Sequence, residues 1–128
     1  MYQNKYIQYK AIFKQDGETE TIQYQANGLS HKGKKTCLKF DIPENTIDIS
    51  YGEDEICLKH GQSCLKLNVN KDIWNQYQLP YGQALLKTRV CLFEANDHRI
   101  KLKYELHDQQ SLISTVYIFI TMTTVEEA

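Results

Sequence analysis

Hydrophobic and polar residues alternate with a period of two along almost the whole chain. The pattern is clearest over residues 7–13 and 99–106, where Ile100, Leu102 and Tyr104 share one face and charged residues occupy the other. Successive side chains of a β-strand point to opposite faces, so this alternation predicts strands that are buried on one side only. No segment combines a 3.6-residue period with helix-capping residues, and we predict no helix.

Turn signals separate the alternating segments at intervals of roughly 8–12 residues, a spacing typical of all-β barrels and sandwiches. They include Asp16-Gly17, the glycine at Gly61 and the "ANDH" stretch, while Asn27-Gly28 is expected to break or bulge the second strand. About ten strands are predicted. They cover residues 7–13, 21–26, 35–40, 47–51, 56–59, 64–69, 74–81, 84–92, 99–106 and 112–124.

Short connections between consecutive strands favour an antiparallel meander. Closing a meander into a barrel removes its exposed edges, so the predicted fold is an all-β, antiparallel up-and-down barrel of about eight to ten strands. The length of 128 residues suits one domain, which is expected to span residues 1–128.

The last predicted strand differs from the others because it is apolar on both faces. Val116, Ile118 and Ile120 would point into the barrel, while Tyr117 and Phe119 would point outward. A half-buried strand is expected to be polar on its outer side. The outer face should therefore be covered by another strand, by the tyrosine-rich N-terminus or by a second copy of the chain, which makes Tyr117 and Phe119 candidate homodimer contacts.

The charge balance of 15 basic and 16 acidic residues gives a net charge of −1. We expect no nucleic-acid partner, since such proteins usually present a strongly basic face. No apolar run approaches the roughly 20 residues of a membrane helix, and the polar N-terminus lacks the apolar core of a signal peptide. We therefore expect a cytoplasmic protein without a membrane partner, whose four cysteines are reduced thiols.

Two of the cysteines, Cys57 and Cys64, lie in one predicted hairpin, "EICLKHGQSCLKL". A two-residue turn at His60-Gly61 would place them directly opposite each other. The spacing differs from the C-x-x-C of redox and zinc modules, so plain structural thiols are favoured over a redox-sensitive pair or a metal clip.

Catalytic motifs are missing from the sequence. Ser63 lies in a hairpin and not in a G-x-S-x-G elbow, there is no phosphate-binding P-loop, and no two histidines have the spacing of metal ligands on one element. We expect a protein that is not an enzyme and that uses no cofactor or metal.

From about Ala11 to Met122 the chain resembles the YwiB-like family, a domain of unknown function. Three stretches carry the likeness: "LKHGQSCLKL", "IWNQYQLPYGQALLKT" and "RIKLKYELH". The resemblance implies a calycin-like, or lipocalin-like, β-barrel. It implies no substrate, cofactor or active-site residue.

Two functions remain open from the sequence. The first is binding of a small, partly apolar ligand inside the barrel, for which the candidate residues are Tyr24, Phe40, Tyr77, Arg89 and Tyr104. An inward arginine could hold a ligand carboxylate, although the inward face of its strand is expected to hold Leu86, Val90 and Leu92. An interior of about eight strands can equally be filled by side chains. The alternative function is an interaction module without a pocket, acting through Tyr117 and Phe119.

Overall fold

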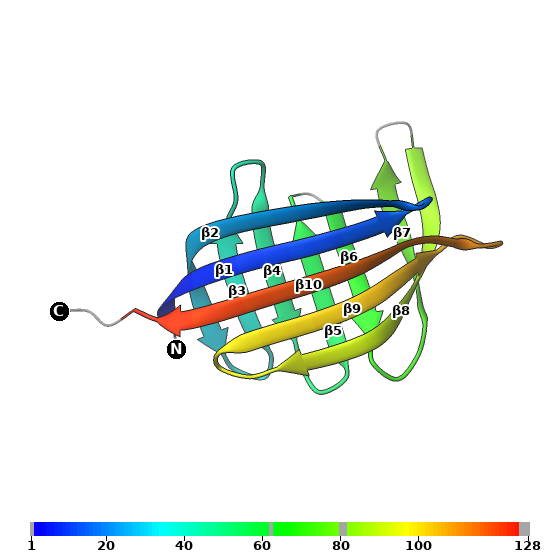
Figure 1. Ribbon diagram of the computed structural model, residues 1–128. Helices are drawn as coiled ribbons and strands as arrows, with labels where there is room; N and C mark the ends of the chain where they lie inside the picture. Colours follow the sequence, from blue (N-terminus) through cyan, green and yellow to red (C-terminus); the bar gives the residue numbers. More distant parts are fainter. Residues whose placement is uncertain (1, 62, 80–81, 126–128) are drawn as a thin grey trace.

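The computed structural model describes residues 2–61, 63–79 and 82–125, and these form ten β-strands (Figure 1). The strands are β1 (Tyr2–Gln15), β2 (Glu18–Lys32), β3 (Thr36–Asp41), β4 (Thr46–Tyr51), β5 (Glu55–His60), β6 (Ser63–Asn68), β7 (Ile73–Leu79), β8 (Gly82–Ala95), β9 (Arg99–His107) and β10 (Leu112–Thr124). The described part of the chain has no helix with the length and hydrophobicity needed to span a lipid bilayer.

All ten strands belong to one antiparallel sheet with the order β6-β5-β4-β3-β2-β1-β10-β9-β8-β7. Consecutive strands therefore pair with each other, except for β6 and β7 at the two ends of the order, and β1 pairs with β10 to join the two ends of the chain (Figure 1). The sheet curls into a nearly closed barrel, so the predicted all-β up-and-down barrel is confirmed. The start of β1 and the end of β10 lie at one end of it, where Lys5 is opposite Thr124.

The interior is built from alternate residues of the strands, as the period of two predicts. Several side chains are almost completely inaccessible to solvent, including Ile7 of β1, Ile49 of β4 and Ile120 of β10. Their neighbours in sequence are more exposed on the outer face, and most of them are polar, such as Gln8, Asp48 and Thr121. Burial of this aliphatic interior is the main force that holds the sheet curled.

Among the described residues, no backbone ladder joins β6 to β7, where the barrel closes. At this seam the side-chain amide of Asn75 on β7 makes the hydrogen bonds to β6 that the backbone of a paired strand would make. Its Oδ1 accepts from Lys66 N at 2.8 Å, and its Nδ2 donates to Lys66 O at 2.9 Å. Thr88 Oγ1 of β8 donates to the same carbonyl at 2.8 Å. Asn75 and Thr88 are both buried, so the seam is sealed by side-chain hydrogen bonds to the backbone of β6.

Two local features differ from the prediction. β2 continues through Gly28 without a break, since Gly28 pairs with Lys5 on one side and Phe40 on the other. In β8 the register shifts between Val90 and Leu92, which places a bulge there. A bulge reverses the alternation that follows it. Leu92 is therefore outside and 42% exposed, contrary to the expected inward position.

The β5–β6 hairpin turns one residue later than predicted. His60 pairs with Ser63 and Gly61 adopts a positive φ of 64°. The cysteines are consequently not directly opposite each other: Cys57 is opposite Lys66, and Cys64 is opposite Lys59. The seventh strand was predicted to extend to Tyr81, which lies outside the described residues.

Candidate functional site: a cavity at one end of the barrel

An internal, partly open cavity of about 260 Å³ lies at the end of the barrel where β1 ends, β10 begins and the β5–β6 hairpin turns. The side chains that line it are mostly apolar: Tyr9, Phe13, Ile47, Leu58, His60, Ser63, Leu65, Tyr77, Tyr104, Leu106, Ser114, Val116 and Ile118. This arrangement of an apolar wall with a few polar groups is typical of small-molecule sites.

Three tyrosines bring most of the polar character into the cavity. Tyr9 comes from β1, Tyr77 from β7 and Tyr104 from β9, so strands that are distant in sequence converge on one space. Ser63 and Ser114 add hydroxyl groups. Among the described residues that line the cavity, none is an aspartate, glutamate, lysine or arginine, so the site offers hydrogen bonds but no permanent charge.

Burial keeps the phenols of Tyr9 and Tyr104 protonated. Burial raises the pKa of Tyr9 to about 12. It also raises the pKa of Tyr104, with a further contribution from the nearby Tyr9 and Tyr77. A neutral phenol can donate a hydrogen bond and accept one. At physiological pH the cavity therefore presents neutral hydroxyl donors to an occupant.

The raised pKa of Tyr9 predicts a loss of stability in alkali. Between pH 10 and pH 12 the unfolded chain releases this proton while the folded protein retains it, so the free energy of unfolding falls as the pH rises through that window. The contribution of Tyr9 at pH 12 should be about 2–3 kcal/mol. Urea unfolding measured from pH 8 to pH 12 would show it. Tyr9→Phe should flatten the slope, whereas Tyr2→Phe on an exposed ring should not; equal slopes in all three proteins would contradict the assignment.

The opposite end of the barrel is filled. Only about 10 Å³ of free space lies among the side chains there, which include Lys5, Tyr51 and Met122. Lys5 is buried and donates to Thr124 Oγ1 at 2.9 Å, and the Tyr51 ring meets Phe93 edge-on with 5.4 Å between centroids. The interior is thus packed at one end and hollow at the other.

Comparison with known families places this fold in context. The family model described as "Domain of unknown function (DUF1934)" matches residues 7–120. The chain belongs to the DUF1934 family. The crystal structure of the ywiB protein from Bacillus subtilis is similar, with a TM-score of 0.71 and 16% identity over 96% of this chain and 94% of that one. That likeness shows a shared fold, and the predicted YwiB-like resemblance is confirmed. No match was found among curated proteins.

The five predicted ligand residues of this DUF1934 domain are distributed unevenly. Tyr77 and Tyr104 line the cavity. Phe40 is 2% exposed and packs against the Tyr9 ring at 5.4 Å between centroids, so it supports the cavity wall from the core. Tyr24 lies opposite Tyr9 on β2 and packs against the core without lining the cavity.

Arg89 is on the outer surface and not in the interior. Its Nη2 donates to Asp72 Oδ2 at 3.1 Å and its Nε to Asp72 Oδ1 at 3.3 Å. The inward position of this part of β8 is taken by Thr88 at the seam. The hypothesis of an inward arginine that binds a ligand carboxylate is therefore wrong.

Four other cavity residues were not predicted from the sequence: Tyr9, His60, Ser63 and Ser114. The signal that could have identified them is that each is a polar residue at an inward position of its strand, and all four line the same cavity as Tyr104.

The predicted interface residues Tyr117 and Phe119 lie on the outer face of β10. Their rings are nearly parallel, with 6.4 Å between centroids. Both rings are half-buried, and the ammonium groups of Lys103 and Lys14 lie 4.9 and 5.4 Å from the centre of the Tyr117 ring. The chain's own lysines thus cover part of this apolar surface by cation–π contacts.

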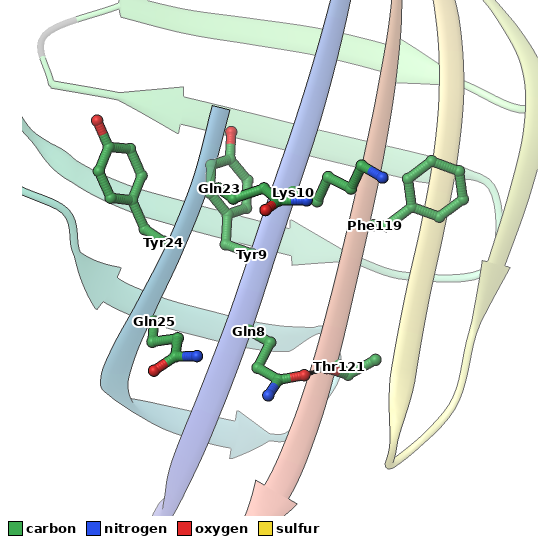
Figure 2. A pocket seen from close by; sticks show the side chains of 8 residues that line it. All are labelled: Gln8, Tyr9, Lys10, Gln23, Tyr24, Gln25, Phe119 and Thr121. Carbon is green, nitrogen blue, oxygen red and sulfur yellow. Dashed lines mark hydrogen bonds between the residues drawn. The ribbon is translucent and has the colours of Figure 1, made fainter. Parts of the chain in front are cut away.

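A broad, open hollow extends over the same outer face (Figure 2). Figure 2 shows Gln8, Lys10, Gln25 and Phe119 spread across β1, β2 and β10. Thr121 Oγ1 donates to Gln8 Oε1 at 3.2 Å. This surface mixes amide, lysine and aromatic side chains and is more open than the internal cavity, so the internal cavity is the better candidate for a small ligand.

Proposed function

We propose that this protein is a non-enzymatic barrel that binds a small, uncharged and largely apolar molecule in its internal cavity. The observation that supports the proposal is the convergence of Tyr9, Tyr77 and Tyr104 on an apolar space of about 260 Å³. Apolar side chains would supply most of the affinity through burial, and the phenols would orient the occupant.

The lining restricts the chemistry of the occupant. Without a charged side chain among the described lining residues, a charged ligand would lose its hydration and gain no ionic partner. A carbonyl or ether oxygen, in contrast, could accept from a tyrosine hydroxyl. The volume lies just below the usual range of about 300–1,000 Å³ for ligand sites, so the ligand should be smaller than a typical drug molecule.

A non-enzymatic role is consistent with the groups available. The residues of the described lining that could take part in proton transfer are the tyrosines and His60, and no carboxylate among them is placed to orient the imidazole. General acid–base and nucleophilic catalysis normally need such a matched set within hydrogen-bond distance.

A pair of probes with the same shape tests the proposal. Acetophenone carries a carbonyl acceptor and α-methylstyrene, with a CH2 group in place of the oxygen, does not, so acetophenone should bind about 2- to 10-fold more tightly if a phenol donates to it. Binding would be followed by NMR chemical-shift changes at cavity residues. Tyr104→Phe should reduce this ratio, and Tyr24→Phe, which changes a tyrosine outside the cavity lining, should leave it unchanged. Failure of both probes to shift the cavity signals would contradict the proposal.

Native mass spectrometry of the protein purified from its own host provides an independent test. A bound small molecule that is lost on denaturation is expected. Its absence, together with no binding of either probe, would favour a barrel whose cavity has no ligand.

A further inference from the structure

Cys57 and Cys64 are in direct contact on the outer face of the β5–β6 hairpin. Their Sγ atoms are 3.1 Å apart, and both side chains are half-buried. The contact is diagonal, because the backbone register places Lys66 opposite Cys57 and Lys59 opposite Cys64. Diagonal neighbours across an antiparallel pair are normally separated by about 7–8 Å between Cα atoms. The sulfurs meet only because both side chains lean toward each other.

We propose that these two thiols are an oxidation site at which an intramolecular disulfide forms between β5 and β6. A disulfide usually requires Cα atoms about 4.4–6.8 Å apart, so the two strands must shift slightly along each other. The position of β6 in the sheet permits this movement. Among the described strands β6 has a backbone ladder with β5 alone, so the shift disrupts no second ladder and changes only the side-chain hydrogen bonds of Asn75 and Thr88 to Lys66 at the seam.

The oxidant we assign is a low-molecular-weight disulfide such as oxidised glutathione. One protein thiolate attacks a sulfur of this molecule, forming a mixed disulfide and releasing one glutathione thiolate. The second protein sulfur then attacks the first, which forms the protein disulfide and releases the second glutathione. Two protein thiols are thereby oxidised, one glutathione disulfide is reduced to two thiols, and the protein loses two hydrogen atoms.

The surroundings predict slow reaction, unlike that of a catalytic redox centre. Burial and the neighbouring Cys64 thiol raise the pKa of Cys57 to about 11, with Lys59 lowering it and Asp48 raising it. Since the thiolate is the nucleophile, Cys57 is a poor first attacker at neutral pH. Whichever sulfur attacks first, the other closes the bridge, because the contact already holds it next to the site of reaction.

The other two cysteines lack this geometry. Cys37 lies in the same row across the sheet as Cys57, but Ser50 of β4 stands between them. Two strand spacings amount to about 10 Å, which is too far for a bridge. Cys91 is exposed at the bulge of β8. These two residues therefore serve as internal controls.

The test is oxidation of the full chain with oxidised glutathione at pH 8, followed by alkylation of the remaining thiols and peptide mass spectrometry. Before alkylation we expect a species about 2 Da lighter than the reduced protein, and after alkylation a peptide link between Cys57 and Cys64 with Cys37 and Cys91 free of any link. Dithiothreitol should reverse the change. Cys57→Ser and Cys64→Ser should each abolish this species, whereas the double variant Cys37→Ser/Cys91→Ser should retain it. Stable glutathione adducts on Cys57 or Cys64 without a link between them would overturn the proposal.

Discussion

Asn75→Leu is expected to lower the free energy of unfolding by about 3–4 kcal/mol. The side chain is 6% exposed and makes two hydrogen bonds to the backbone of Lys66, at 2.8 and 2.9 Å. Leucine has a similar size but can neither donate nor accept, so Lys66 N would be left without a partner at the seam. A buried unsatisfied donor costs about 1–3 kcal/mol beyond the lost bond. Urea unfolding would measure the change.

Two further variants separate the hydrogen bonds from the packing. Thr88→Val keeps the β-branched shape and removes the bonds of Oγ1 to Lys66 O and Ile73 O. Since Lys66 O still accepts from Asn75, a loss of about 1 kcal/mol is expected. Gln76→Leu, on the exposed face of the same strand, should change stability by less than about 0.5 kcal/mol. Similar stability of Asn75→Leu and Gln76→Leu would show that the seam does not depend on the amide.

The seam also shows where sequence reasoning reached its limit. The period of two was sufficient to predict the strands, because most strands have one face in the core and a more exposed face outside. Asn75 and Thr88 occupy inward positions where that pattern calls for apolar residues. A single polar residue in the apolar pattern does not by itself indicate a seam. The role of Asn75 and Thr88 depends on hydrogen bonds to Lys66 across the boundary between β6 and β7, and the local sequence carries no signal for such a non-local contact.

The bulge in β8 also limited the prediction of which side chains point into the barrel. One extra residue between Val90 and Leu92 reverses the alternation, so Phe93 packs against the core where Leu92 had been expected. Turn length was equally hard to predict: a shift of one residue moved Cys57 from direct to diagonal opposition with Cys64. Strand existence was therefore predictable, whereas register at bulges and turns was not.

The cavity was predictable only in part. Tyr77 and Tyr104 could be assigned to the interior because they follow the inward periodicity. Whether inward residues leave space depends on the sum of side-chain volumes from strands that meet at one end of the barrel. Phe40 illustrates the point, since it is as inward as Tyr104 but lies in the filled core behind Tyr9. The presence of an inward aromatic residue therefore does not show whether it lines a cavity or fills the core.

Gly28→Val is expected to destabilise the protein by about 3 kcal/mol or more. β2 passes closest to its neighbours at Gly28, where a Cβ atom would lie 2.4 Å from Ile7 Cδ1, 2.6 Å from Lys39 O and 3.0 Å from Phe40 Cβ. Ile7 is fully buried, and the Lys39 carbonyl belongs to the ladder between β2 and β3. Relief of the clash would require movement of backbone that is fixed by hydrogen bonds on both sides, and tightly packed interiors resist such movement.

The contribution of each clash can be separated. Ile7→Val removes the Cδ1 atom that a Cβ at position 28 would meet. The double variant Gly28→Ala/Ile7→Val should therefore recover part of the stability that Gly28→Ala alone loses. The recovery should be incomplete, because the contact with Lys39 O remains. Gly52→Ala is the matched control, since its Cβ would meet only Lys35 Cγ, at 3.9 Å, and its stability should be close to that of the parent protein. The comparison comes from thermal unfolding of the parent protein, Gly28→Ala, the double variant Gly28→Ala/Ile7→Val and Gly52→Ala. Equal melting temperatures for Gly28→Ala and Gly52→Ala would refute the close approach of β2 to β3 at this residue.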